Sequence, residues 1–230
     1  MEQTTRQAYI RALAVVQKRV YEMGMASITA VQQAMQAFLQ QDRNLAAQVM
    51  DDDDKIDHMI VDIEDRCILL IAKQQPMAHD LRVIATGFKI STDIERIGDH
   101  AFDIAKTALD FSTSGQDAVD FSYTPQLAEC AAAMLGMAMQ AYQTADIMLA
   151  EQVCKRDDEM DELFAKTFLE LSQQVTNEAQ QARRITQLLF VARFLERIGD
   201  HAVNIAEWVI YLETAERIRK NRKKNPSVVS

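Results

Sequence analysis

The stretch of sequence that decides the fold occurs twice. Residues 94–106 read IERIGDHAFDIAK, and residues 195–207 read LERIGDHAVNIAE. The string Glu-Arg-Ile-Gly-Asp-His-Ala is identical in both copies, at Glu95–Ala101 and Glu196–Ala202. Two such copies about a hundred residues apart indicate that the chain arose by internal duplication.

A second internal match extends the duplication toward the N-terminal side of each copy. Residues 48–57, QVMDDDDKID, align without a gap to residues 152–161, QVCKRDDEMD. The duplication therefore covers most of the chain. It also indicates that the string DDDDK at residues 51–55, which resembles a protease cleavage tag, is native sequence. The alignment pairs acidic residues of the two halves: Asp53 with Asp157, and Asp57 with Asp161.

The composition predicts an all-α protein. In 230 residues there are only six Gly and three Pro, while Ala, Gln, Leu, Met and Glu, which are good helix formers, are abundant. Apolar residues recur at helical spacing almost throughout. We expect six long helices: residues 5–40, 43–74, 76–111, 124–152, 157–175, and 182 into the basic tail.

A segment rich in Gly and Ser separates the two copies, and Thr124-Pro125 after it is typical of a helix start. The predicted organisation is two tandem three-helix bundles. The expected parts are a first repeat (1–112), a linker (113–123), a second repeat (124–218) and a basic, disordered tail (219–230).

Charge and cysteine content exclude several classes of protein. The net charge is −9, which disfavours general nucleic-acid binding. Cys67, Cys130 and Cys154 form no CxxC pair, so neither a disulfide framework nor a thiolate zinc site is indicated. The N-terminal residues lack the apolar stretch of a signal peptide, and the apolar runs are too short to span a bilayer. We expect a cytoplasmic protein that reaches a membrane only through its partners.

Acidic side chains recur at helical spacing near each signature. Residues four apart lie on one helical face, so the carboxylates near each signature form a strip. Oxygen-rich clusters of this kind suit hard or borderline cations such as Mg²⁺, Mn²⁺ and iron. The alternative is that the strips simply face water. The strips consist of Glu95, Asp99 and Asp103 in the first copy and Glu196 and Asp200 in the second, with Asp53, Asp57, Asp157 and Asp161 on the preceding helices.

The other signature residues have different expected roles. Gly98 and Gly199 lie inside helices, where Gly costs roughly 1 kcal/mol relative to Ala, so we expect another helix or an ion to approach closely. His100 and His201 lie about a hundred degrees around the helix from the preceding Asp, which favours packing or hydrogen bonding over metal ligation. The arginines of the signatures, also off the strip, could pair with acids such as Asp93.

Known catalytic patterns are missing from the sequence. A ferritin-like diiron enzyme needs Glu-x-x-His on two helices, and no histidine here has Glu three residues before it. There is also no P-loop, G-x-S-x-G or H-E-x-x-H motif. We therefore predict no catalytic residues and no enzymatic activity.

The duplicated signature, together with Gln75-Pro-Met-Ala-His-Asp-Leu-Arg82 and the acidic segment at residues 53–57, resembles the PhoU family. The resemblance implies two three-helix bundles, often a homodimer, and a negative regulator of the bacterial phosphate-starvation response. The implied partners are the ATPase subunit of the phosphate ABC transporter and the PAS region of a sensor histidine kinase.

The resemblance also implies metal ions (magnesium, manganese, iron or zinc) on Glu95 with Asp99 and on Glu196 with Asp200. Asn204 stands where Asp103 extends the first strip, so we expect the second site to bind metal less tightly. Three functions remain open: an adaptor protein, a metal-dependent enzyme, and a purely structural repeat protein. The last would not explain why the carboxylate strips recur.

Overall fold

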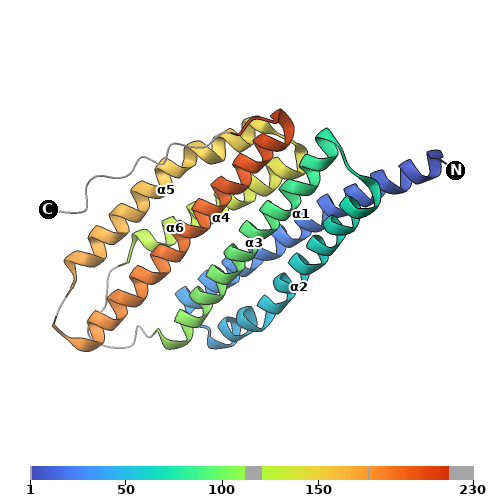
Figure 1. The fold of residues 1–230 in the computed structure, drawn as a ribbon. Helices are drawn as coiled ribbons and strands as arrows, with labels where there is room; N and C mark the ends of the chain where they lie inside the picture. Colours follow the sequence, from blue (N-terminus) through green and yellow to red (C-terminus); the bar gives the residue numbers. More distant parts are fainter. Residues whose placement is uncertain (1, 112–120, 176, 218–230) are drawn as a thin grey trace.

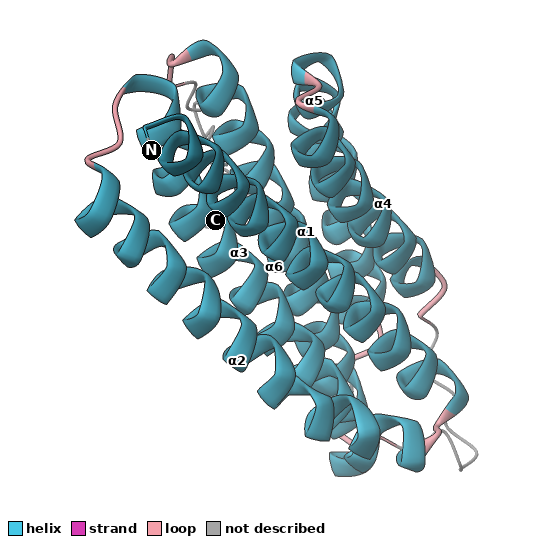
Figure 2. Ribbon diagram, turned by 90° about the vertical axis from the view of Figure 1, so that its right-hand side faces the viewer, coloured by secondary structure: helices cyan, strands magenta, loops and turns pink. Residues whose placement is uncertain are grey.

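The computed structural model describes residues 2–111, 121–175 and 177–217. All regular secondary structure in these ranges is α-helical, which confirms the predicted fold class. The helices run side by side and are joined at their ends (Figures 1 and 2). They are α1 (Glu2–Gln40), α2 (Arg43–Gln74), α3 (Ala78–Asp110), α4 (Tyr123–Thr144), α5 (Ile147–Gln173) and α6 (Ala179–Thr214).

The six helices form two three-helix bundles that share a central contact. Helices α1, α2 and α3 pack on one another, and so do α4, α5 and α6. The bundles meet where α3 packs on α6 and α1 on α4. Among the described residues, α2 contacts only α1 and α3, and α5 only α4 and α6. The two signature helices therefore lie at the centre, and the two helices that carry the aspartate pairs lie at opposite edges (Figure 1).

The predicted boundary between the fourth and fifth helices is wrong. The periodicity predicts a fourth helix that ends at residue 152 and a fifth that starts at 157, but the break lies at Ala145 and Asp146. Ala145 adopts a left-handed conformation with φ of 54°, and the Asp146 carboxylate accepts a hydrogen bond from a main-chain N–H of α5. Such an N-cap satisfies an otherwise unpaired donor. Asp42, which the duplication aligns with Asp146, caps α2 in the same way.

Two other helix ends differ from the prediction by a few residues. Pro76 precedes α3 instead of starting it, because Gln75 is left-handed and Met77, the N-cap, is extended. Helix α6 begins at Ala179 and stops before the basic tail, since Ala215 has a positive φ of 63°. Most of the predicted linker and all of the predicted tail lie outside the described residues.

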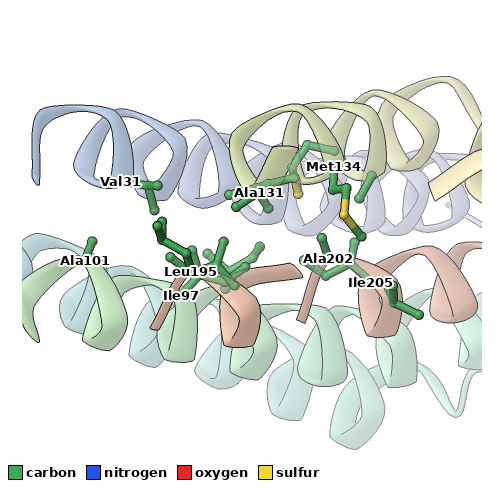
Figure 3. Packing of buried hydrophobic residues seen from close by; sticks show 14 of the residues in the cluster. Val31, Ile97, Ala101, Ala131, Met134, Leu195, Ala202 and Ile205 are labelled. Carbon is green, nitrogen blue, oxygen red and sulfur yellow. The ribbon is translucent and has the colours of Figure 1, made fainter. Parts of the chain in front are cut away.

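Small and branched apolar residues fill the space between the two bundles. Figure 3 shows side chains of α1, α3, α4 and α6 meeting there. Burial of apolar surface stabilises the fold by about 25 cal/mol per Å², so this shared core ties the two halves together. The labelled residues are buried: Val31, Ile97, Ala101, Ala131, Met134, Leu195, Ala202 and Ile205.

None of the described helices has an apolar stretch that is long enough to cross a lipid bilayer.

Candidate functional site

The first acidic cluster lies where α2 packs on α3. Partial burial and the nearby charges of Asp57, Asp99, Asp54 and Glu95 raise the pKa of Asp53 to about 6. Such an effect requires that the carboxylates of the two helices lie close together. The structure thus brings together four predicted site residues from two helices: Asp53, Asp57, Glu95 and Asp99.

Gly98 makes this close approach of α2 and α3 feasible. A Cβ atom on Gly98 would lie 3.2 Å from Ile56 Cδ1 and 3.4 Å from Asp53 Oδ1. In the second bundle, a Cβ on Gly199 would lie 3.0 Å from Met160 Cγ, and the duplication aligns Met160 with Ile56. The predicted close helix contact is therefore confirmed at both glycines.

The second acidic cluster lies where α5 packs on α6. Burial and the charge of Asp200 raise the pKa of Glu196, Asp161 adds to the rise, and Arg193 and Arg197 oppose it. One oxygen of Glu196, Oε2, is buried without a hydrogen-bond partner. The other oxygen, Oε1, accepts from Arg193 Nη1 at 2.7 Å, and Arg197 Nε lies 4.0 Å from Oε2. The cluster therefore holds a buried acceptor whose hydrogen-bonding capacity is unused.

The signature arginines balance part of the acidic charge in both clusters. Arg96 Nη1 donates to Asp99 Oδ2 at 3.1 Å, and its Nε lies 3.5 Å from Glu95 Oε2. Arg197 repeats the arrangement, with Nη1 3.3 Å from Asp200 Oδ2. The arginines pair with acids as expected, but with acids of their own helices instead of Asp93.

Asp103 lies beside the first cluster, whereas the structure places Asp157 near Cys130 of α4. Burial raises the pKa of Asp103, with Lys106 opposing and Asp99 adding to the rise. Asp157 lies well inside α5 instead of at its start. Its charge contributes to the raised pKa of Cys130 on α4, which is caused mainly by burial.

Asp93 has a role that the sequence analysis missed. His201 Nδ1 lies 2.8 Å from Asp93 Oδ1, and the Asn204 amide donates to the same oxygen at 3.0 Å. Asn204, which replaces the carboxylate found at Asp103 in the first copy, therefore has a role of its own: its amide helps to join α6 to α3. No local sequence signal identifies this contact, because Asp93 and its two partners lie on helices of different halves whose pairing the sequence does not specify.

His100 of α3 is the residue of the first signature that corresponds to His201. Its ring stacks on Phe194 with 5.7 Å between centroids, and Phe194 stands in the repeat register where the first copy has Asp93. Burial lowers the pKa of His100 to about 4, and the nearby His201 contributes. His100 is thus a neutral packing residue, while its repeat partner is hydrogen-bonded.

The two clusters have the donor chemistry of a cation site. In the described part of the chain, no three His, Cys, Asp or Glu side chains are arranged to hold a metal ion. However, the raised carboxylate pKa values and the unpartnered Glu196 oxygen mark an excess of oxygen acceptors. Hard cations prefer such oxygen ligands.

The PhoU domain family matches twice, at residues 20–108 and 124–209, so that each bundle carries one match. A "Phosphate-specific transport system accessory protein PhoU homolog" of Clostridium acetobutylicum is 36% identical, with 94% of this chain and 99% of that protein covered. A protein of the same description from Rhizobium meliloti is 33% identical, with 95% and 92% covered.

A solved structure has the same fold. The crystal structure of PhoU from Pseudomonas aeruginosa superposes with a TM-score of 0.84 at 32% identity, and the match covers 89% of this chain and 98% of that one. The double domain match, the relatives of nearly equal length and the shared fold agree with one another. This chain is a member of the PhoU family.

Proposed function

We propose that this protein is a negative regulator of the phosphate-starvation response, acting as a cytoplasmic adaptor between the phosphate ABC transporter and a sensor histidine kinase. The observation that carries the proposal is the match over nearly the full length to accessory proteins of the phosphate-specific transport system. Its partners would be the ATPase subunit of the transporter and the PAS region of the kinase. The adaptor has no catalytic step of its own.

The regulatory mechanism is a shift in the population of kinase states. A protein that binds one state of its partner more tightly than the other moves the equilibrium toward that state. When phosphate is plentiful, the adaptor would hold the kinase in its phosphatase-favouring state. The six-helix body offers long helical surfaces for such binding, and a homodimer would present them twice.

The carboxylate clusters are proposed to hold divalent or trivalent metal ions, with magnesium, manganese, iron and zinc as candidates. A bound cation would offset the burial and the repulsion that together raise the pKa of Asp53 and Glu196. Arg96 and Arg197 would swing away from or share the carboxylates that they contact now. The proposed ligands are Asp53, Asp57, Glu95, Asp99 and Asp103 in the first bundle, and Asp157, Asp161, Glu196 and Asp200 in the second.

Affinity capture from membranes tests the adaptor role. The full chain, carrying an affinity tag, is mixed with detergent-solubilised membranes of the organism that encodes it, and the retained proteins are identified by mass spectrometry. The proposal predicts recovery of the transporter ATPase and the histidine kinase above an untagged control. Recovery of neither protein, together with metal-dependent turnover of a phosphate ester, would favour the enzyme alternative.

A further inference from the structure

An open groove lies between the N-terminal part of α1 and the C-terminal part of α2, remote in sequence from the signatures. Its volume is about 370 Å³. Ala12 and Val15 of α1 and Leu69 of α2 form part of its apolar lining, while Arg11, Arg66 and Lys73 supply its charge. The lining contains three cationic side chains and no acidic one.

The apolar part of this surface is not covered by the rest of the described chain. Val15 is 39% exposed and Leu69 is 51% exposed. A group of large apolar side chains that remains in water and is bordered by polar residues is typical of an interaction site.

The charges at the groove select the kind of partner. Arg66 Nε donates to Asp62 Oδ2 at 2.8 Å, whereas Arg11 and Lys73, which also line the groove, form no ion pair with another described residue. The protein as a whole carries a net charge of −9. Asp80 lies beside the lining residue Tyr9, so Arg11 and Lys73 are the local charges that attract acidic groups to the groove.

We propose that this groove, here named the α1–α2 groove, docks an amphipathic helix of a partner protein whose apolar stripe is flanked by Asp or Glu. Two neighbouring helices present a groove into which side chains of a third helix can pack. The proposal rests on the adaptor role and deepens it by naming the surface and the chemistry of the partner. An anionic membrane fits less well, because the rest of the acidic protein would be repelled from it.

The test uses the full chain and two fluorescein-labelled synthetic helices with the same leucine stripe, one flanked by Glu and one by Lys. Fluorescence anisotropy should show at least about tenfold tighter binding of the Glu-flanked helix, which corresponds to about 1.4 kcal/mol. Arg11→Glu combined with Lys73→Glu should abolish this preference. The matched control is Lys18→Glu combined with Lys89→Glu, two exposed cations outside the groove, and it should bind like the unmodified chain.

A steric variant tests the groove independently of charge. Ala8 lines the groove and is exposed, so Ala8→Trp should fill part of it and weaken binding of the Glu-flanked helix about tenfold or more. Circular dichroism checks that each variant remains folded. Equal binding of the two helices, or binding unchanged in both groove variants, would overturn the proposal.

Other occupants give different results. A dimer in light scattering that Ala8→Trp converts to monomer would show that a second copy fills the groove, and would overturn the partner-helix proposal. Binding to phosphatidylglycerol vesicles that the charge reversal abolishes would assign the groove to lipid instead. If the groove variants no longer bind the Glu-flanked helix but still repress phosphate-starvation genes in cells, the groove proposal fails while the adaptor role stands.

Discussion

His201 of α6 lies 2.8 Å from Asp93 of α3, and this hydrogen bond crosses from one bundle to the other. Both residues are largely buried, with side-chain exposures of 20% and 14%. Asn204 donates to the same Asp93 oxygen at 3.0 Å. Beside the apolar core, the two halves are thus held together by a polar contact centred on one carboxylate.

Asp93→Ala should destabilise the protein, because it leaves the His201 and Asn204 donors without their acceptor. Loss of a buried partner typically costs about 1–3 kcal/mol. Urea denaturation followed by circular dichroism measures the change. Asp65→Ala removes an exposed acid of α2 and should change stability by less than about 0.5 kcal/mol. Equal effects of the two substitutions would show that the contact contributes nothing.

Substitutions of three glycines should separate helix propensity from helix packing. A Cβ on Gly136 of α4 would meet nothing within 4 Å, so Gly136→Ala should stabilise the protein by roughly 0.5–1 kcal/mol. Gly98→Val should destabilise it by about 1–3 kcal/mol, since its side chain would push Ile56 and Asp53 away. Gly199→Val should do the same through Met160. The Tm of each variant, measured by thermal unfolding, gives the sign of its stability change. A Gly98→Val variant that is more stable than the unmodified chain would contradict the close contact of α2 and α3.

Asp53→Asn should stabilise the metal-free protein in a pH-dependent manner. The pKa of Asp53 is about 6 in the folded protein, above its ordinary value of 3.8, so the folded state binds the extra proton between these values. The stability of the folded protein therefore falls as pH rises from 3.8 to about 6, and this cost of the charged carboxylate stays constant above pH 6. One pKa unit is worth about 1.4 kcal/mol, and partial solvent screening reduces this, so we expect a gain of roughly 1 kcal/mol at pH 7.

The measurement for Asp53 is urea denaturation in the presence of a chelator at about pH 7.5 and near pH 3.5, on either side of the window in which the proton is bound. The gain from Asp53→Asn should be present at the higher pH and absent at the lower. Asp65→Asn on the same helix is the control and should show no such difference. A gain that is independent of pH would mean that the neighbouring carboxylates do not act on Asp53.

Metal binding should depend on both signature aspartates. Asp99→Asn combined with Asp200→Asn removes one carboxylate from each cluster, so the metal content of protein purified without chelator should fall. A ligand that binds only the folded state raises its stability by mass action, and the rise in Tm on adding Mn²⁺ should shrink accordingly. The control pair is Asp65→Asn with Glu162→Gln. Unchanged metal content in the double variant would place the site elsewhere.

Much of the fold was predictable because the signals for it are local. Low glycine content and helical periodicity predict an all-α fold of six helices. The repeated signature predicts that these helices form two halves of three. The break at Ala145 was missed because Ala is a strong helix former, and only the capping carboxylate of Asp146 interrupts the pattern. Aligning Asp146 with Asp42 across the duplication would have located it.

The candidate site was predictable only in part. The i, i+4 carboxylates identify one face of a helix, and the closeness of Asp53 to Asp99 follows from α2 packing on α3 beside Gly98. The role of Asp93 could not be predicted, because its partners His201 and Asn204 belong to the other bundle. Such contacts depend on how the two halves are rotated against each other, which local patterns do not specify.

The regulatory role is tested most directly by measuring a phosphate-starvation reporter in cells grown in phosphate-rich medium. Deleting the gene for this chain should leave the reporter switched on, because the kinase is no longer held in its phosphatase-favouring state. Deleting the kinase gene as well should remove most of that expression. Normal repression in the single deletion, or high expression that persists in the double deletion, would contradict the adaptor account.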